Sequence, residues 1–270
     1  MTIFFLTCHA SDVPLDDAWL GPRERELSAG FRIEKRRRDW RLGRWTAKQA
    51  LQRFQRRLDE PSTSPNAVEL LAAPDGAPEF HGLDPHAPVQ VSLSHSGGVG
   101  VCALGRLPRK AASSAQINSD IGSGIDSAIG CDLEAIEPRS EVFLSDFFTA
   151  REQAAFARAP TAARDLLIAL VWSAKESALK VLRCGLRRDT RSVEVSIEAL
   201  EEDALALAPK ALHRTEFHAF EVRDLEQELR FTGWWRQYDG RIMTIAVGSY
   251  SAAHPCRTPW VPMSPPIDLG

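Results

Sequence analysis

The chain has 270 residues, of which 44% are hydrophobic and 26% charged, and its formal net charge is −3. This composition is typical of a globular protein with a sizeable core and excludes a disordered chain. The small net charge gives no sign of a nucleic-acid partner, but arginines gather in residues 23–57 and acidic residues in 132–152 and 194–203. A basic lobe beside an acidic one suits a polyanionic ligand held partly through a metal.

The cysteines and the first residues of the chain help to predict the cellular compartment. The five cysteines are scattered, without a CxxC pair or a Cys/His cluster, so neither a disulfide framework nor a zinc site is indicated. The start, MTIFFLTCHASD, is apolar for only a few residues and lacks a positive segment, which favours a strand over a signal peptide. No apolar run reaches the roughly 18 residues that a membrane-spanning helix needs. We therefore expect a cytoplasmic protein.

The N-terminal lobe is expected at residues 1–105. Its predicted elements are, in order, a strand at 3–7, a charged stretch at 23–41, an amphipathic helix at 42–58, a brief strand after the turn at 76–80, and strands at 89–94 and 99–104. Apolar residues of the helix recur at helical spacing and face a core, while Arg44 and Lys48 lie on another side. The last two strands form a hairpin whose corner carries Ser94, His95 and Ser96.

The C-terminal lobe is expected at residues 129–250, after a small, polar linker or surface insertion at 106–128 and before a proline-rich tail at 251–270. Its predicted elements are a strand at 129–134, helices at 143–148, 149–158 and 163–183, and strands at 192–197, 216–222, 230–235 and 243–249. Each lobe thus has a helix packed on an antiparallel sheet. This content predicts an α+β protein of two similar lobes related by a pseudo-twofold axis.

The stretch WSAKESALK, from Trp172 to Lys180, ends a long apolar run in the third helix of the second lobe. Trp172, Glu176 and Lys180 follow at spacings of four and share a face, while Lys175 lies about 100° round from Glu176. A carboxylate and two ammonium groups therefore emerge from an apolar helix within two turns. On an isolated helix these residues would form an ordinary solvated Glu–Lys pair. Whether they belong to a functional site therefore depends on the other motifs of the chain.

Two carboxylates lie side by side in the first strand of the second lobe. The strand period sends Asp132 and Glu134 to one face and Cys131 and Leu133 to the other. Adjacent carboxylates repel unless a cation lies between them, and Mg²⁺ prefers carboxylate, water and phosphate oxygens. Exposed acidic residues at a strand end are the common alternative, so this pattern by itself is a weak indication of metal.

The Ser94-His95-Ser96 corner does not indicate a serine hydrolase. Adjacent side chains of an extended segment point apart, which makes a poor nucleophile–base pair, and no G-x-S-x-G elbow surrounds them. Backbone N–H groups, hydroxyls and an imidazole at a turn suit anion binding. An ordinary polar hairpin corner explains the same residues equally well.

Taken together and in order, SLSHS, IGCDLE and WSAKESALK resemble the 4′-phosphopantetheinyl transferases, specifically the larger single-chain type that activates nonribosomal peptide and polyketide synthases. The last two motifs are separated by about 40 residues, as in that family, and match at nearly every position; Cys131 stands where the family usually has an aliphatic residue. The resemblance covers roughly residues 1–250 and is weak in the N-terminal third. It implies a monomer of two lobes with the site in the cleft between them.

The resemblance also implies residue roles. Asp132, Glu134 and Glu176 are similar to the carboxylates that hold Mg²⁺ against the pyrophosphate of coenzyme A. Glu176 resembles the residue that deprotonates the acceptor serine, directly or through water, and Lys180 the lysine at the pyrophosphate. The resemblance further implies coenzyme-binding roles for Lys175 near the phosphates, for Ser94 and His95 at the 3′-phosphate, and for Arg44 in the basic helix of the first lobe.

The chain departs from the family pattern in two places. Gly76-Ala77-Pro78 lacks the basic residue that the family usually has between glycine and proline, and Arg37, Arg41 or Arg44 are candidates to supply the charge. The segment 106–128 is longer than the short lobe connection that we expect.

We therefore expect transfer of 4′-phosphopantetheine from coenzyme A to a serine of an apo acyl or peptidyl carrier protein, with Mg²⁺, and release of 3′,5′-ADP. Such catalysis consists mainly of positioning and charge neutralisation. One alternative is another Mg²⁺-dependent phosphohydrolase or nucleotidyl transferase, although no P-loop supports it. A second alternative is a catalytically silent partner of a synthase, which the presence of Asp132, Glu134, Glu176 and Lys180 disfavours.

Overall fold

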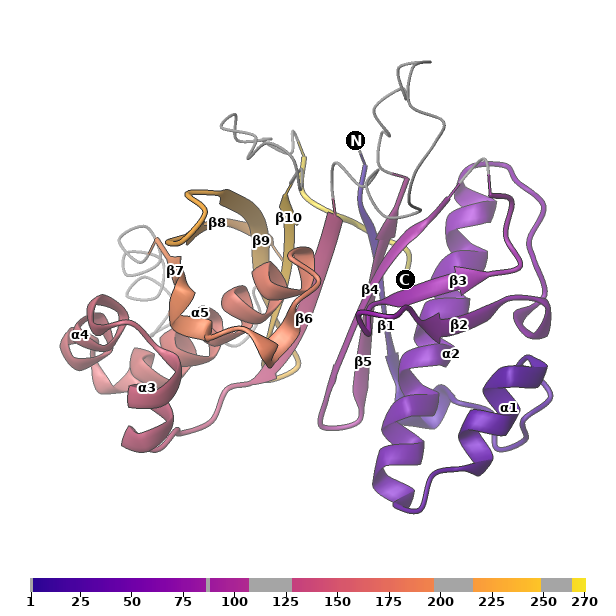
Figure 1. Ribbon diagram of the computed structural model, residues 1–270, viewed down its shortest axis with the longest axis horizontal. Coiled ribbons are helices and arrows are strands. Elements are labelled where there is room, and N and C mark those ends of the chain that lie inside the picture. The colour runs from indigo at the N-terminus through magenta and orange to yellow at the C-terminus, as the bar shows by residue number, and fades with distance from the viewer. Residues whose placement is uncertain (1, 86–87, 107–127, 197–215, 249–263) are drawn as a thin grey trace.

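The computed structural model describes residues 2–85, 88–106, 128–196, 216–248 and 264–270. Almost all of the predicted linker and much of the predicted tail lie outside these residues. The described elements form four layers, a helix, two sheets and a second helix, with the sheets in the middle (Figure 1). No helix in the described residues combines the length and apolar character that crossing a bilayer requires.

The first half of the chain builds one sheet and the helices on its outer face. Its elements are β1 (Phe4–His9), α1 (Pro22–Ala29), α2 (Glu34–Arg57), β2 (Glu69–Ala72), β3 (Pro78–His81), β4 (Gln90–Ser96) and β5 (Val99–Gly105), with 3-10 turns at Ala10–Asp12 and Pro65–Ala67. The sheet has the order β11-β1-β5-β4, in which β11 (Ile267–Asp268) comes from the end of the chain, β1 is antiparallel to β5, and β5 is antiparallel to β4. β2 and β3 form a separate antiparallel pair.

The second half builds a five-stranded antiparallel sheet covered by α5. Its elements are β6 (Ala128–Ala135), α3 (Glu141–Phe147), α4 (Ala150–Arg158), α5 (Thr161–Val181), β7 (Val193–Val195), β8 (His218–Asp224), β9 (Arg230–Tyr238) and β10 (Arg241–Gly248), with 3-10 turns at Gly185–Arg187 and Thr190–Ser192. The strand order is β6-β10-β9-β8-β7. The last strand, β11 (Ile267–Asp268), returns to the first half and pairs parallel with β1.

Alternating apolar residues explain the layers. In β1, Phe4 and Leu6 pack with α2, whereas Phe5 points into the space between the two sheets. In β6, Cys131 and Leu133 also point into this central core, so the opposite face of β6 turns toward α5. The prediction of an α+β protein with antiparallel sheets is confirmed. The pseudo-twofold relation between the halves stays a prediction.

Two local predictions need correction. The helix expected at 42–58 begins at Glu34, because the charged stretch before it is helical although it lacks an apolar period. Ser94, His95 and Ser96 belong to β4 rather than to the hairpin corner. The corner is Gly97-Gly98, whose φ angles of 53° and 78° are ones that glycine adopts without strain.

Each half contains a buried ion pair between a lysine of its long helix and a glutamate near the start of a shorter helix. The pairs are Lys48 with Glu24 and Lys175 with Glu152. In the first half, Glu24 near the start of α1 accepts hydrogen bonds from the backbone N–H groups of Gly21 and Leu70, both at 2.9 Å. Lys48 of α2 forms an ion pair with Glu24, and both side chains are almost fully buried. A lysine of the long helix is thereby tied to the capping carboxylate of a shorter helix.

Gly130 allows a close approach between β6 and α5. A Cβ atom at this position would lie 1.9 Å from the carbonyl oxygen of Ser177 and 3.1 Å from Cβ of Lys180. Only glycine fits, since no side chain can share space with a helix backbone. This contact sets the distance between the faces of β6 and α5 that carry the polar motifs.

We predict that Gly130→Ala destabilises the protein by about 3 kcal/mol, because the helix must shift to admit the methyl group. The matched control is Gly43→Ala in α2, where the nearest atom to the new Cβ lies 3.8 Å away. This control should be neutral or stabilising by up to about 1 kcal/mol, as expected for a helix interior. Urea denaturation of both variants checks the prediction, and equal midpoints would contradict it.

Candidate active site

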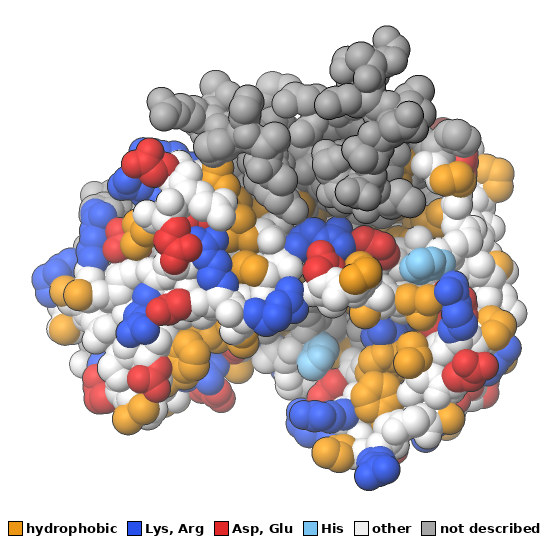
Figure 2. All heavy atoms as spheres, in the orientation of Figure 1, with side chains coloured by type: hydrophobic (Ala, Val, Ile, Leu, Met, Phe, Trp, Pro, Cys, Tyr) orange, Lys and Arg blue, Asp and Glu red, His pale blue; other side chains and the backbone are white. Residues whose placement is uncertain are grey.

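A cavity of about 650 Å³ lies where α2, β4, β6 and α5 meet. All of the predicted site residues except Lys175 line it: Arg44, Ser94, His95, Asp132, Glu134, Glu176 and Lys180. The face of the molecule seen in Figure 2 is hollowed between its two halves, with Lys and Arg side chains around the hollow. The structure thus gathers residues that are far apart in the sequence and come from both halves of the chain.

Asp132 lies at the centre of the cluster. Its Oδ1 accepts hydrogen bonds from Ser94 Oγ at 2.7 Å and from Lys180 Nζ at 2.9 Å. Burial alone would raise the pKa of Asp132, but the Lys180 charge and these hydrogen bonds hold it below its ordinary value. Its Oδ2 is buried and has no hydrogen-bond partner within the described residues. A buried carboxylate oxygen without a partner is costly unless a ligand completes it.

The pKa of Glu176 is strongly raised. Burial first, and then the negative charge of Asp132, raise the pKa of Glu176 to about 8, although the Lys180 charge opposes the shift. Lys180 Nζ lies 3.8 Å from Glu176 Oε2 and also donates to the carbonyl of Cys131 at 2.8 Å. Glu176 is therefore largely protonated at neutral pH unless an additional cation is present.

Glu134 has its own cation. Burial and the charge of Asp132 raise the pKa of Glu134, whereas Arg139, 2.9 Å away, and a hydrogen bond from Trp172 lower it. Arg139 was not singled out from the sequence. The sequence feature that could have indicated this contact is that Arg139 follows Glu134 by only five residues, just after the end of β6.

Within the described residues, no group of three His, Cys, Asp or Glu side chains is gathered tightly enough to hold a metal ion. Lys180 binds Asp132 and Arg139 binds Glu134, so cations of the chain itself occupy part of the carboxylate oxygens. The chemistry of the donors nevertheless fits a hard divalent cation, since the cluster is all carboxylate and Asp132 Oδ2 is unsatisfied.

Arg44 lines the cavity as an unpaired cation. Its guanidinium stacks on the Trp40 ring, 3.7 Å from the ring centroid, and no described residue accepts a hydrogen bond from its Nε. Burial lowers the pKa of Arg44 to about 10, partly offset by Glu24. His95 also lines the cavity and is exposed, whereas Ser94 is engaged with Asp132.

The other two arginines considered for the missing charge point elsewhere. Arg41 is nearly buried, forms an ion pair with Asp17 and donates to the carbonyl of Asp16 at 3.0 Å. Arg37 lies 3.6 Å from the same Asp17. Of the candidates Arg37, Arg41 and Arg44, only Arg44 faces the site, and Ala77 lines a neighbouring cavity without offering a charge.

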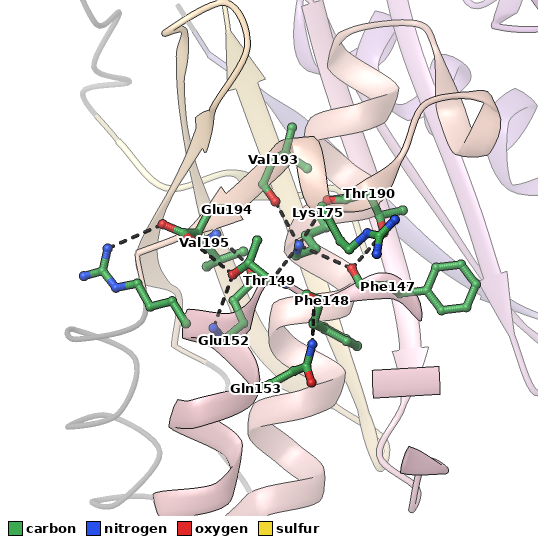
Figure 3. A network of polar contacts seen from close by, with 12 residues as sticks. Phe147, Phe148, Thr149, Glu152, Gln153, Lys175, Thr190, Val193, Glu194 and Val195 are labelled. Atoms are coloured by element: carbon green, nitrogen blue, oxygen red, sulfur yellow. Dashed lines mark hydrogen bonds and ion pairs between the residues drawn. The ribbon is translucent and has the colours of Figure 1, made fainter. Parts of the chain in front are cut away.

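The proposed phosphate contact of Lys175 is wrong. The Lys175 side chain is fully buried, and its Nζ lies 2.6 Å from Glu152 Oε2 (Figure 3). Lys175 does not line the cavity. Glu152 also accepts from the backbone N–H groups of Thr149 at 2.8 Å and Val195 at 3.0 Å. Lys175 Nζ further donates to the carbonyl oxygens of Val193 at 2.8 Å, Thr190 at 3.0 Å and Phe147 at 3.4 Å. The prediction failed because helical spacing separates Lys175 from Glu176 without showing which of them faces the core.

Comparison with known families supports the interpretation of this cluster as part of a transferase. Residues 128–230 match the family model described as "4′-phosphopantetheinyl transferase superfamily". The part of the chain from 128 to 230 is thus similar to the 4′-phosphopantetheinyl transferase superfamily. The matched residues include Asp132, Glu134, Glu176 and Lys180, and they confirm the resemblance found in the sequence and the prediction of a transferase of this kind.

Comparisons with solved structures and with curated proteins add little to this result. One similar solved structure is a holo-(acyl-carrier-protein) synthase from Bacillus anthracis str. Ames in complex with CoA (3′,5′-ADP). It is 19% identical over 38% of this chain and 92% of that chain, and its TM-score of 0.33 is too low to establish a common fold. No curated protein matches the chain.

A buried hydroxyl cluster under the carboxylates of the candidate site was missed from the sequence. Ser173 and Ser177 of α5 lie 2.9 and 2.7 Å from the hydroxyl of Thr244 in β10. Thr244 is the cross-strand partner of Asp132, so its side chain lies on the same face of the sheet as that carboxylate. The cluster joins α5 to the sheet directly beneath the site.

We predict that the effect of Glu176→Gln on stability depends on pH. Above the ordinary pKa of glutamate and up to about 8, the folded chain keeps a proton on Glu176 that the unfolded chain has lost. The stability of the wild type therefore falls as the pH rises through this window. Without added divalent cations, Glu176→Gln should melt like the wild type near pH 5 and at a higher temperature near pH 9. A difference that shrinks between pH 5 and pH 9 would contradict the assigned shift.

We predict that Lys175→Met destabilises the transferase by about 3–5 kcal/mol, because it leaves Glu152 as a buried, uncompensated charge. Lys35→Met is the matched control, since its pair with Asp39 is exposed and should contribute less than about 1 kcal/mol. Urea midpoints measure both. An unchanged midpoint for Lys175→Met, combined with weaker coenzyme A binding, would restore the phosphate-binding role.

Proposed function

We propose that this protein transfers the 4′-phosphopantetheine group of coenzyme A to a serine of an apo acyl or peptidyl carrier protein, with Mg²⁺, releasing 3′,5′-ADP. The observation that carries the proposal is the cluster of Asp132, Glu134, Glu176 and Lys180 in a cavity of a chain whose residues 128–230 are similar to the transferase superfamily. Its arrangement suits a substrate that brings both a cation and phosphate groups.

Asp132, Glu134 and Glu176 would hold the magnesium ion. The unsatisfied Oδ2 of Asp132 and the raised pKa of Glu176 support this assignment, because a divalent cation would complete the former and favour deprotonation of the latter. When bound, Mg²⁺ supplies charge neutralisation for the phosphate oxygens.

Glu176 is the proposed general base. A bound divalent cation would favour the deprotonated carboxylate of Glu176, which is the form that accepts a proton. In the reaction, the serine hydroxyl loses its proton to Glu176 while its oxygen bonds to the phosphorus that bears pantetheine. The bond from that phosphorus to the oxygen shared with 3′,5′-ADP breaks, and the ammonium of Lys180 stabilises the charge on the leaving phosphate.

Arg44 and His95 are the proposed contacts to the coenzyme. Arg44 is a partly desolvated cation without an ion pair in the described residues, so a phosphate would satisfy it. His95 is exposed on the wall of the same cavity. Ser94 reaches the site through its hydrogen bond to Asp132, which gives it a role in orienting that carboxylate.

We further propose a monomer of two lobes, 1–105 and 129–250, acting in the cytoplasm. All of the proposed site residues come from one chain, so the site needs no second copy. Cys8, Cys102, Cys131 and Cys184 are free thiols, which suits a reducing compartment.

The test is mass spectrometry of apo carrier proteins incubated with coenzyme A, MgCl₂ and the enzyme. We expect the wild type to add the phosphopantetheine mass, and Asp132→Ala and Glu176→Ala to lose at least about a hundredfold in rate, as for groups that act on the reacting centre. Glu221→Gln, which removes a carboxylate of β8 that pairs with Arg230 of β9, should retain activity.

Full activity in both Asp132→Ala and Glu176→Ala would overturn the assignment of these residues. Turnover of nucleoside triphosphates in place of coenzyme A would favour the phosphohydrolase or nucleotidyl transferase alternative. Circular dichroism of each variant establishes that loss of activity does not reflect unfolding.

A further inference from the structure

A second cavity, of about 780 Å³, adjoins the candidate active site. It is lined by the loop between β2 and β3, by β4 and by the segment after α5. Arg44, Leu93 and Lys180 line both cavities, so a ligand that reaches Lys180 in the first can extend into the second. The second cavity therefore lies next to the place where the transferred phosphate would lie.

Arg183 ties the two halves of the chain together at the rim of this cavity. Its guanidinium donates to Asp75 at 2.5 and 3.1 Å and to Glu79 at 2.8 Å. Its φ of 56° is unusual for a residue other than glycine, so the backbone here accepts a rare conformation. Because Asp75 and Glu79 neutralise its charge, Arg183 is a weak candidate for binding an anionic ligand. Its role is to hold the cavity wall in place.

Arg187 differs from Arg183 in that its charge is unopposed. Its Nη2 donates to the carbonyl oxygen of Arg183 at 2.9 Å, and no carboxylate of the described residues forms an ion pair with it. Its Nη1 lies 3.7 Å from the point where a Cβ atom on Gly76 would stand. The Arg187 guanidinium is thus held over the Gly76-Ala77 loop and lines the second cavity alone, not the first.

We propose that Arg187 binds the 3′-phosphate of coenzyme A; this rests on the proposed transferase function. Coenzyme A carries two phosphate sites, a pyrophosphate and a 3′-phosphate on the far side of its ribose. With the pyrophosphate at Lys180, the 3′-phosphate extends into the second cavity, which His95 does not line. Arg187 and Arg44 both line this cavity, and neither forms an ion pair with a carboxylate of the described residues. A planar guanidinium can donate two hydrogen bonds to such a phosphate.

The test compares coenzyme A with dephospho-coenzyme A, which lacks only the 3′-phosphate. Binding of each to the full-length enzyme is measured by isothermal titration in MgCl₂, and KM and kcat are measured in the carrier-protein assay. Arg187→Ala should weaken coenzyme A binding about tenfold, equivalent to one charged hydrogen-bond pair, with kcat preserved and dephospho-coenzyme A unaffected. Arg187→Lys should recover part of the loss because it keeps the charge.

The matched control is Arg191→Ala, which removes a nearby exposed arginine that pairs with Asp189 and does not line either cavity. It should leave the preference for coenzyme A over dephospho-coenzyme A unchanged. An Arg187→Ala enzyme that keeps this preference, or that loses affinity for both compounds equally, overturns the proposal. A wild type that transfers nothing from either compound would instead overturn the proposed function itself.

Discussion

The close contact between β6 and α5 at Gly130 determines the geometry of the site. The helix backbone at Ser177 lies where a side chain of Gly130 would be, and Lys180 follows on the same helix face. Asp132, two residues along β6, is thereby brought within hydrogen-bond distance of Lys180. A bulkier residue at position 130 would separate the sheet from the helix and with it the carboxylate of the strand from the groups of the helix.

The same short distance brings Glu176 close to Asp132, and repulsion between the two carboxylates helps to raise the pKa of Glu176. Glu176 shares a partly buried space with Asp132, so both cannot be charged at low cost, and the proton remains on Glu176. Lys180 relieves Asp132 directly and Glu176 only at 3.8 Å. The buried pair of Lys175 and Glu152 holds the helix in the rotation that keeps Glu176 in the cavity.

Local features of the sequence predicted local structure well. The capping box of Thr149 and Glu152 and the Asp239-Gly240 turn each depend on a few adjacent residues, and the structure contains both. Strand alternation also placed Asp132 opposite Cys131 correctly. The burial of Lys175 was missed because it depends on α4 and β7, which are distant in the sequence, and the early start of α2 was missed because a solvated charged helix has no apolar period. The arrangement of two sheets face to face follows only when one apolar face of each sheet, from β1 and β5 and from β6 and β10, is seen to share a single core.

The repeated Lys–Glu pair allows the two halves to be aligned residue by residue. When Lys48 is placed on Lys175, Gln49 falls on Glu176 and Arg53 falls on Lys180. Arg53 donates to the carbonyl of Leu269 in the returning C-terminal segment. The same helix position thus carries a carboxylate in one half and a neutral amide in the other. The helix position that carries Lys180 of the site in α5 therefore carries, in α2, an arginine that anchors the C-terminal segment.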